Sequence, residues 1–205
     1  MKEIKDKKDL ISSIKPGDNL MLELGCGEVK HDGQSISIDL IDYEDVDIIG
    51  DIYEVLKLIP TASVKHIYSS HVFEHLENLP NILIEIQRIL QLDGELEVLV
   101  PHFSNSFFYS DPTHTTFFGL YTFSYYFKSN LFKRSVPKYA LIDGMELFYV
   151  KLIFRSFKPH YLSHAIRKFF QCIFNLSSSM QEVYEESFVN FISCYEVQFI
   201  IKKTQ

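Results

Sequence analysis

The chain has 205 residues, of which 46% are hydrophobic and 23% are charged, a composition typical of one globular domain with a sizeable core. It excludes a disordered tail or a collagen-like repeat, and no apolar run approaches the roughly 20 residues of a membrane-spanning helix. The net charge of −7 argues against a general nucleic-acid-binding protein.

Positive charge is concentrated in one stretch of this acidic chain. From Lys128 to Lys168 there are nine Lys or Arg and only two acidic residues. The stretch predicts a surface that meets an anion or an anionic membrane, and a solvated basic face is the alternative. The first nine residues alternate Lys with acids, unlike a secretory signal, and three scattered cysteines fit a reducing compartment. We therefore expect a cytoplasmic protein, with peripheral contact to the inner membrane face as an option.

Local patterns predict the elements in chain order. Ile4, Ile11 and Ile14 share one helical face, so residues 1–15 predict a short helix. Asn78 predicts the cap of a later helix, and Asp93-Gly94 predicts a turn after it. Apolar or alternating runs predict seven strands, over residues 19–24, 35–40, 46–50, 64–69, 95–100, 145–154 and 195–202. The alternation predicts an α/β fold with an open, mostly parallel sheet, and charged ends place the last strand at an edge or in an antiparallel position.

Two later segments have unusual composition. From Phe103 to Phe127, 11 of 25 residues are Phe or Tyr. This aromatic-rich insertion after the fifth strand predicts a lid or pocket wall, or alternatively a local mini-core over the sheet edge. Residues 161–174 place apolar side chains at helical spacing beside His, Arg and Lys. That helix is predicted to pack in the core or to lie in a membrane interface.

The most informative segment for ligand binding is Leu22–Gly27, an apolar strand that runs into two glycines separated by one residue. Such glycines let the backbone approach a ligand closely, and Asp39 at the end of the next strand can accept hydrogen bonds from a ribose. The short 28–34 loop lacks the third glycine and the helix of a dinucleotide site. This loop suits a nucleoside ligand that has no phosphate but carries an ammonium group. We expect Glu23 to help hold that ammonium group.

These patterns together resemble class I S-adenosylmethionine-dependent methyltransferases of the small bacterial type 11 kind. The resemblance is strong over about residues 18–102 and is carried by the segments 22–27, 37–40, 46–51, 67–76 and 88–96. It implies a Rossmann-like sheet of about seven strands and S-adenosylmethionine as the cofactor, with S-adenosylhomocysteine as the product. The predicted cofactor site consists of Glu23, Gly25, Cys26, Gly27, Asp39, Leu40, Asp51, Ile52 and Ser70.

Two groups of residues are candidates for chemistry. The first group is His71, Glu74 and His75, whose i, i+3, i+4 spacing suits a divalent-metal site that His102 or His114 would complete. A metal is nevertheless not expected, because a segment of this kind often only begins a helix. His102 directly follows the fifth strand, and Asp111 precedes His114 in a turn. We expect His102 or His114 to assist proton removal, with Asp111 orienting the His114 ring.

The predicted activity is O-methylation of a small or carrier-linked anionic acceptor that bears phosphate, such as a sugar phosphate, a nucleotide sugar or a cell-envelope glycan precursor. Lys128, Lys133, Arg134 and Lys138 are candidates to bind that phosphate. The alternatives are a methyltransferase for a quinone or aromatic lipid, and a non-catalytic cofactor-binding regulator. We expect one domain over 1–205, with a cofactor half (18–102), a lid and acceptor region (103–176), and a closing helix and edge strand (177–205).

Overall fold

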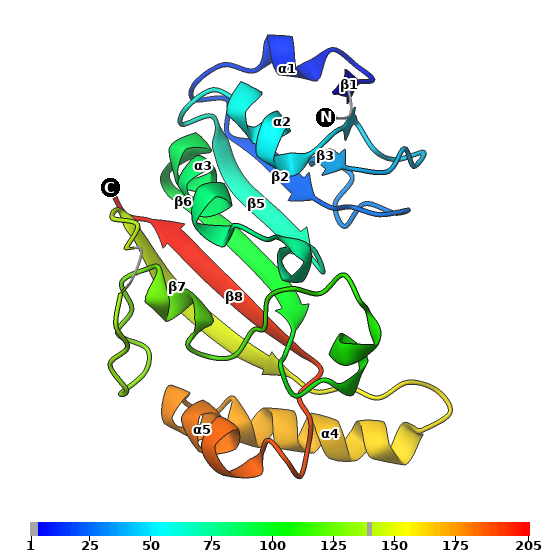
Figure 1. The fold of residues 1–205 in the computed structure, drawn as a ribbon, viewed down its shortest axis with the longest axis vertical. Coiled ribbons are helices and arrows are strands. Elements are labelled where there is room, and N and C mark those ends of the chain that lie inside the picture. Colours follow the sequence, from blue (N-terminus) through cyan, green and yellow to red (C-terminus); the bar gives the residue numbers. More distant parts are fainter. Residues whose placement is uncertain (1–3, 139–140) are drawn as a thin grey trace.

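The computed structural model describes residues 4–138 and 141–205. Its centre is an eight-stranded open sheet in the order β1-β4-β3-β2-β5-β6-β8-β7 (Figure 1). β2 to β6 run parallel, whereas β1 is antiparallel to β4 and β8 is antiparallel to both of its neighbours. The strands are Lys5–Asp6 (β1), Leu20–Leu24 (β2), Ile36–Asp39 (β3), Ile48–Ile49 (β4), Val64–Ser70 (β5), Leu90–Pro101 (β6), Met145–Ile153 (β7) and Glu196–Lys203 (β8). The predicted mostly parallel α/β sheet is confirmed, with β1 as an additional strand.

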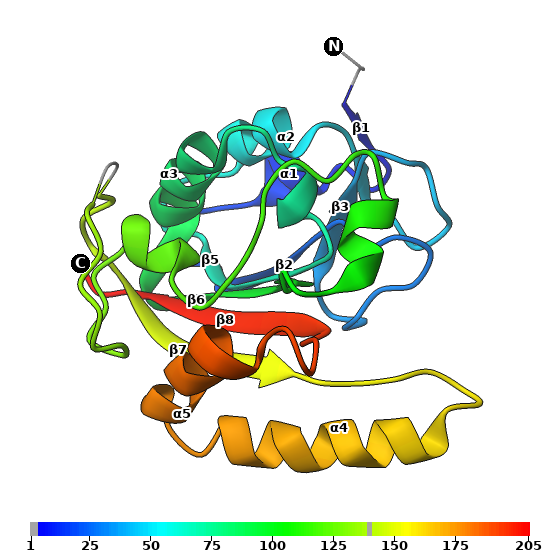
Figure 2. The same ribbon diagram turned by 60° about the horizontal axis from the view of Figure 1, so that its bottom comes forward.

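Helices cover the two faces of the sheet unequally. Figures 1 and 2 show α2 and α3 on one face, and α4 and α5 on the other face beside β7 and β8. The helices are Leu10–Ser13 (α1), Ile52–Leu58 (α2), Leu79–Ile89 (α3), Tyr161–Phe174 (α4) and Ser178–Val183 (α5). Short 3₁₀ turns are Phe73–His75 (η1), Ser106–Ser110 (η2) and Thr122–Tyr125 (η3), and α5 continues as a π-helical turn, Tyr184–Phe188 (η4). None of the helices in the described part of the chain has the length and hydropathy needed to cross a bilayer.

Helix α3 begins and packs as its sequence predicts. The Asn78 side chain accepts a hydrogen bond from the Asn81 N–H (3.3 Å), and Pro80 lies in the first turn. The predicted turn at Asp93-Gly94 is wrong, because β6 already begins at Leu90. The two residues form a bulge instead, where Asp93 has φ 59° and the register with β5 shifts.

The predicted helix over residues 1–15 is also largely wrong. Its first three residues lie outside those described, residues 5–6 form β1 against β4, and only Leu10–Ser13 is helical. Asp9 has φ 53°, and the Asp6 carboxylate accepts hydrogen bonds from the Lys8 and Ile11 N–H groups. These local bonds compete with a continuous helix.

The last strand lies inside the sheet. β8 is antiparallel, as its charged ends suggest, but it is inserted between β6 and β7, so the predicted edge position is wrong and β7 forms the edge. The reason is the alternation within β8, where Val197, Phe199 and Ile201 are all fully buried. A strand with such a buried face gains more from two neighbours than from one.

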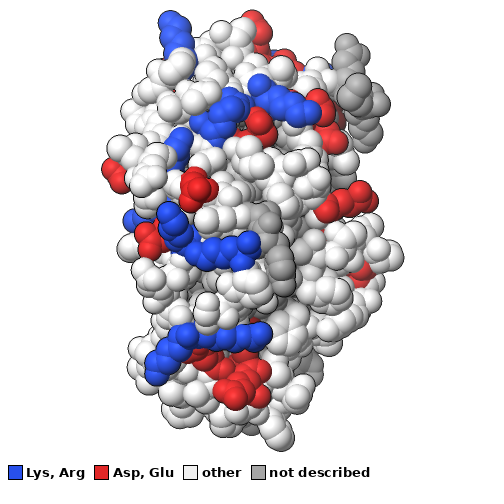
Figure 3. Space-filling model, turned by 60° about the vertical axis from the view of Figure 1, so that its left-hand side comes forward, with Lys and Arg blue, Asp and Glu red and all other residues white. Residues whose placement is uncertain are grey.

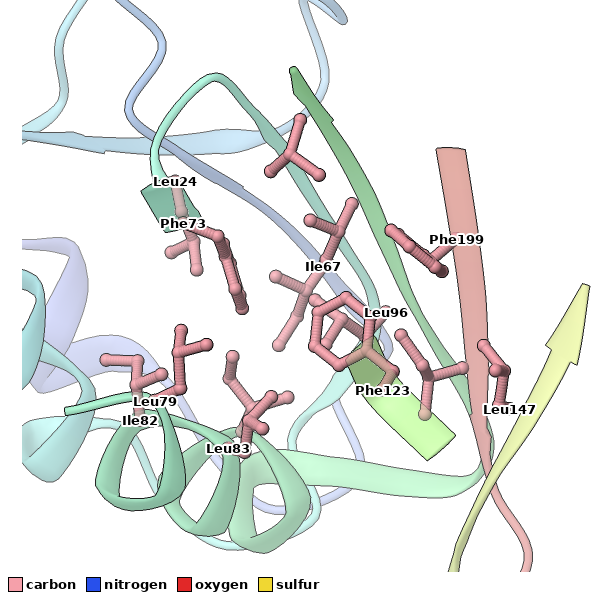
Figure 4. Close-up of a cluster of buried hydrophobic side chains, with 14 of the residues drawn as sticks. Leu24, Ile67, Phe73, Leu79, Ile82, Leu83, Leu96, Phe123, Leu147 and Phe199 are labelled. Atoms are coloured by element: carbon pink, nitrogen blue, oxygen red, sulfur yellow. The ribbon is translucent and has the colours of Figure 1, made fainter. Parts of the chain in front are cut away.

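The aromatic insertion divides into two parts. Phe118, Phe123 and Phe127 are fully buried, and Figure 4 shows Phe123 lying among side chains of the sheet, near Phe199. The ring centroids of Phe123 and Phe199 are 4.8 Å apart. The first part instead leaves Phe107, Tyr109 and Phe117 more than half exposed. The mini-core interpretation therefore holds for residues 118–127, whereas residues 107–117 bury Phe108 and present their other Phe and Tyr rings at the surface.

Candidate functional site

A cavity of about 1360 Å³ lies at the carboxyl ends of β2, β3 and β5, where open parallel sheets bind ligands. Every residue of the predicted cofactor site lines it: Glu23, Gly25, Cys26, Gly27, Asp39, Leu40, Asp51, Ile52 and Ser70. The structure thus gathers residues from four separate segments around one space.

The two glycines at the end of β2 have different surroundings. Gly25 has φ 70°, and a Cβ there would lie 2.1 Å from Val72 Cγ2. Gly27 has φ 60°, and a Cβ there would meet nothing within 4 Å. Gly25 is therefore required by packing, whereas Gly27 presents its backbone to open space in the cavity.

Two aspartates face the cavity and also organise the backbone around it. Asp39 accepts hydrogen bonds from the Gly27 N–H (2.9 Å) and from the Ile41 N–H (2.9 Å). Asp51 caps α2 by accepting a hydrogen bond from the Tyr53 N–H (2.9 Å). A carboxylate oxygen has two lone pairs, so both side chains retain capacity to accept bonds from a ligand.

The short loop over residues 28–34 is held by buried carboxylates rather than by a helix. Glu23 accepts hydrogen bonds from the His31 N–H (2.9 and 3.0 Å) and from the Ser35 hydroxyl (3.2 Å). Its bonds therefore anchor the loop, in addition to its place on the cavity wall. Lys30 forms an ion pair with the buried Asp47, which also pairs with Lys8. Burial opposes the charge on Asp47, but the hydrogen bonds from Lys30 and Lys8 outweigh it and lower the pKa of Asp47 to about 2.

Sequence reasoning missed several residues that line the same cavity. The rings of His31 and Tyr68 stack with centroids 4.1 Å apart, and Tyr53, Asn81 and Thr113 also contribute to the wall. Tyr68 was detectable, since it precedes Ser69-Ser70 at the carboxyl end of a strand. The other four come from loops and helices that only the fold brings to this place.

His71, at the rim of the cavity, joins two buried acids. Its Nε2 lies 2.7 Å from Glu196 Oε1, and its Nδ1 lies 3.2 Å from Glu74 Oε1. Burial opposes the charge on the ring, but these hydrogen bonds prevail and raise the pKa of His71 to about 9. Arg155 contributes a second cation to Glu196 at 2.5 Å. Both nitrogens of the His71 ring therefore bind carboxylates, and neither is free to bind a metal.

The predicted metal trio is therefore rearranged. Glu74 and His75 lie together with His114 instead of His71, and one ligand atom from each lies within 4.8 Å of the others. The backbone explains why, since the Glu74 carbonyl accepts hydrogen bonds from the Thr115 and Thr116 N–H groups. Those bonds hold the segment that carries His114 against η1.

His102 is not in the cavity, so the expectation that it lies beside the reacting group is wrong. Its side chain is fully buried, with Nε2 3.1 Å from Glu185 Oε1 and Nδ1 2.8 Å from Ser104 Oγ. Its ring packs against those of Phe103 and Tyr184. These contacts give His102 a structural role.

His114 and Asp111 lie next to the cavity, on either side of the wall residue Thr113. Asp111 Oδ2 is 3.7 Å from His114 Nε2, and Asp111 Oδ1 accepts hydrogen bonds from Thr113. These hydrogen bonds from Thr113 lower the pKa of the Asp111 carboxyl group below its ordinary value. The predicted Asp111–His114 pair is therefore adjacent in space, beyond direct hydrogen-bond distance.

The cations predicted to bind acceptor phosphate lie elsewhere. Lys133 and Arg134 line a separate hollow with Glu182, Glu185 and Glu186, and Lys128 pairs with Asp143 at 3.5 Å. Neither they nor Lys138 line the cofactor cavity. On this side of the molecule Lys and Arg side chains lie next to acidic ones (Figure 3). Local acids therefore neutralise much of the positive charge of Lys128, Lys133 and Arg134.

Comparison with known sequences finds one match that bears on this site. Residues 22–98 match the family model described as a methyltransferase domain. The matched range runs from β2 into β6 and includes every residue predicted for the cofactor site. A search of curated proteins found no match.

Similar solved structures share the fold over nearly the whole chain. An S-adenosylmethionine-dependent methyltransferase from Archaeoglobus fulgidus is 15% identical with a TM-score of 0.57, over 94% of this chain and 89% of that one. Another from Mesorhizobium loti is 12% identical with a TM-score of 0.52, over 97% and 98%. A phosphoethanolamine N-methyltransferase from Haemonchus contortus, solved with phosphomonomethylethanolamine and S-adenosylhomocysteine, is 12% identical with a TM-score of 0.50, over 96% of this chain and 53% of that one.

Proposed function

We propose that this chain uses S-adenosylmethionine to methylate a hydroxyl oxygen of a small or carrier-linked molecule that bears phosphate. The match of residues 22–98 to a methyltransferase domain and the fold shared with S-adenosylmethionine-dependent methyltransferases support the methyltransferase activity. Sugar phosphates, nucleotide sugars and cell-envelope glycan precursors have this chemistry. The observation that carries the proposal is a surface of one arginine and three aromatic rings, joined to the cofactor cavity through Glu196 and His71.

The cavity residues fit the cofactor. Asp39 offers carboxylate oxygens to ribose hydroxyls, and the open space beside Gly27 admits a ligand against the backbone. When bound, S-adenosylmethionine supplies the methyl group, and its transfer to a hydroxyl forms a C–O bond, breaks a C–S bond and releases one proton. The protein's part in this reaction is to orient the acceptor oxygen, which supplies much of the rate enhancement.

The acceptor surface is centred on Arg155. Its guanidinium lies 4.3 Å from the Tyr195 ring centroid and 5.5 Å from that of Phe157, and Phe107 packs against Tyr195. Its side chain is 38% exposed, so an incoming anion can reach it. A planar guanidinium binds phosphate oxygens in pairs, while exposed rings stack on sugars or bases. The Haemonchus contortus enzyme, which was solved with phosphomonomethylethanolamine, is a precedent on a similar fold.

An exposed apolar face on α4 favours a carrier-linked acceptor at a membrane. Tyr161, Leu162 and Phe169 are 63–76% exposed, and the neighbouring Phe191 is 82% exposed. The expectation that the whole apolar stripe packs in the core is therefore wrong, and only its C-terminal end, at Phe174, is buried. The helix begins at Tyr161, four residues after Phe157, so the apolar face follows the acceptor surface closely along the chain.

The charge around α4 matches an anionic bilayer. No acidic residue occurs between Glu146 and Glu182, whereas five Lys or Arg fall in that span. Apolar burial combined with attraction of Lys and Arg to anionic lipids is the usual basis of interfacial helix binding. We therefore assign this face to the surface of an anionic membrane.

The acceptor proposal is tested with paired substrates. Hydroxyl compounds with and without a phosphate are assayed by formation of S-adenosylhomocysteine. Arg155→Gln should raise KM for phosphorylated acceptors by about tenfold or more, as expected for a lost charge-assisted hydrogen bond, and leave cofactor affinity unchanged. Asp39→Asn should weaken cofactor binding instead, and Lys158→Gln, an exposed neighbour, should change neither.

Other results would reject this acceptor class. Equal KM values for both acceptor forms, unaffected by Arg155→Gln, would favour the quinone or aromatic-lipid alternative, which the exposed rings also suit. Cofactor binding without product from any acceptor would favour a regulator.

Membrane contact is tested by co-sedimentation with vesicles of phosphatidylcholine, alone or with phosphatidylglycerol. Binding should require the anionic lipid and fall with salt. Leu162→Glu and Phe169→Glu should abolish it, while Leu92→Glu, at a 60% exposed site on β6, serves as the matched control. Equal binding by all three variants would contradict the assignment.

A further inference from the structure

We infer a binding site for a divalent transition-metal ion, formed by Glu74, His75 and His114 beside the cofactor cavity. One ligand atom from each residue lies within 4.8 Å of the others, a spacing that one ion can bridge with small side-chain movements. The inference concerns ion binding alone, so it stands or falls independently of the acceptor proposed above.

The hydrogen bonds of both histidines leave the same nitrogen free. Thr113 Oγ1 donates its proton to Asp111 Oδ1 (2.6 Å), so it accepts a hydrogen bond from His75 Nδ1 (2.9 Å). His114 Nδ1 donates to the Phe108 carbonyl oxygen (2.8 Å). With Nδ1 protonated in both rings, each Nε2 carries a lone pair. Histidines that bind metals are oriented by donating the other ring N–H in this manner.

Glu74 has an unused carboxylate oxygen. Its side chain is fully buried, its Oε1 bonds to His71, and its Oε2 has no hydrogen-bond partner among the described residues. A buried carboxylate oxygen without a partner is costly, and such exceptions call for an explanation. An ion held by the two Nε2 atoms would satisfy it.

The backbone keeps the three ligands together. The Glu74 carbonyl accepts hydrogen bonds from Thr115 N–H (2.8 Å) and Thr116 N–H (3.1 Å). Glu74 and His75 lie on η1, and His114 directly precedes these threonines. The His75 and His114 ring centroids are 4.7 Å apart, so the pair is positioned before any ion arrives.

The donor set indicates the kind of ion and its use. Two imidazoles and one carboxylate favour zinc, manganese or iron(II) over magnesium or calcium. Three protein ligands leave coordination positions open, as in catalytic rather than structural sites. Because His75 also lines the cofactor cavity, an open position can face the acceptor oxygen and make its proton easier to lose. His114 would then act as a ligand and not as a base.

A simpler arrangement competes with this one. Asp111 Oδ2 lies 3.7 Å from His114 Nε2, so a protonated His114 paired with Asp111 would need no ion. The two arrangements differ in what they bind, and metal uptake separates them.

The test measures binding of Zn²⁺ and Mn²⁺ to chelator-treated protein by calorimetry, with Co²⁺ absorption as a second readout. We expect about one ion per chain. His75→Gln and His114→Gln should each weaken binding by more than about tenfold. Thr113→Val, which keeps all three ligands but removes the partner of His75, should weaken it about 10–100-fold. His66→Gln, a histidine paired with Glu97 on another part of the sheet, is the control.

Three results would overturn the site. They are the absence of stoichiometric binding by the wild type, unchanged affinity in both His75→Gln and His114→Gln, and equal loss in the His66→Gln control. Circular dichroism of each variant establishes that it is folded, and Thr113→Val keeps the question answerable if a ligand variant does not fold. Cofactor binding by the metal-free protein is measured in parallel, so that loss of the ion is distinguished from loss of methyltransferase function.

Discussion

At the scale of single residues, the cofactor loop uses two glycines for two different reasons. Gly25 lies against Val72, so that even one methyl group would overlap it. Gly27 has the same left-handed backbone but open space in front of it. The first glycine is therefore required by the packing of the fold, whereas the second leaves open space for a ligand in the cavity.

Alanine substitutions should separate these roles. Gly25→Ala should greatly reduce the free energy of unfolding, because the new Cβ overlaps Val72 Cγ2, and adding Val72→Ala should restore part of it. Gly27→Ala should lower stability only by about 1–2 kcal/mol, the cost of left-handed backbone, yet weaken cofactor binding. Urea unfolding and calorimetry measure the two effects, and equal stability losses in both variants would contradict this distinction.

At this scale the sequence predicted which residues lie together where the signal is local. A strand, a glycine turn and an acid at the end of the next strand line one cavity, since parallel strands end at one edge of the sheet. The prediction that His102 lies beside the reacting group was wrong, because a position at the end of a strand does not determine which face of the sheet the side chain takes. Leu96, Val98 and Val100 are fully buried, and His102 continues their two-residue period into the core.

At the scale of elements, the loop over residues 28–34 replaces a crossover helix with ion pairs. Asp47 is buried and accepts from Lys30, Lys8 and the Ser37 N–H. These partners hold the loop against β3 and β4, close to the cofactor cavity. The sequence could not predict this anchor, because Asp47 comes 17 residues after Lys30 and the pairing depends on the strand order.

This anchor should make stability depend on pH in a defined window. The pKa of Asp47 is about 2 in the folded chain, below its ordinary value of 3.8. Its contribution is therefore present above pH 4 and is lost as the pH falls through 2, an effect of about 2 kcal/mol. Asp47→Asn should lower the free energy of unfolding at neutral pH by a similar amount and flatten this acid dependence.

Chemical denaturation at several pH values measures the effect. Asp45→Asn, at an exposed position two residues earlier, should retain the wild-type profile. A wild-type acid profile in Asp47→Asn would remove the assigned role.

At the scale of the whole molecule, the aromatic insertion and the last strand close one core. Phe123, Phe118 and Phe199 are fully buried and in ring contact. Composition indicated an aromatic layer, but not which rings it would bury, since that depends on β8 lying between β6 and β7. Helix α3 was predictable from its Asn78 cap and its periodicity, and α4 from its periodicity alone, whereas the strand order was not predictable.

Phe199→Ala should lower the free energy of unfolding by about 3–5 kcal/mol, the usual effect of emptying a buried phenylalanine site. It should also expose residues 118–127 to proteolysis, because they pack on the vacated space. Phe148→Ala, at a 56% exposed position on β7, should change stability by no more than about 1 kcal/mol. Similar losses in the two variants, by thermal or urea unfolding, would contradict the shared core.

The position of β8 also sets an order of events during synthesis. Glu196, the carboxylate that holds His71, emerges from the ribosome 125 residues after its partner. Until then β6 presents an unpaired edge, and β7 has no neighbour to join it to the sheet. The nascent chain can thus assemble strands β1 to β6 early, while Glu196 at the rim of the site and the pairing of β7 with the sheet wait for the last strand. During that interval the unpaired edge of β6 exposes the growing polypeptide to mispairing with other chains.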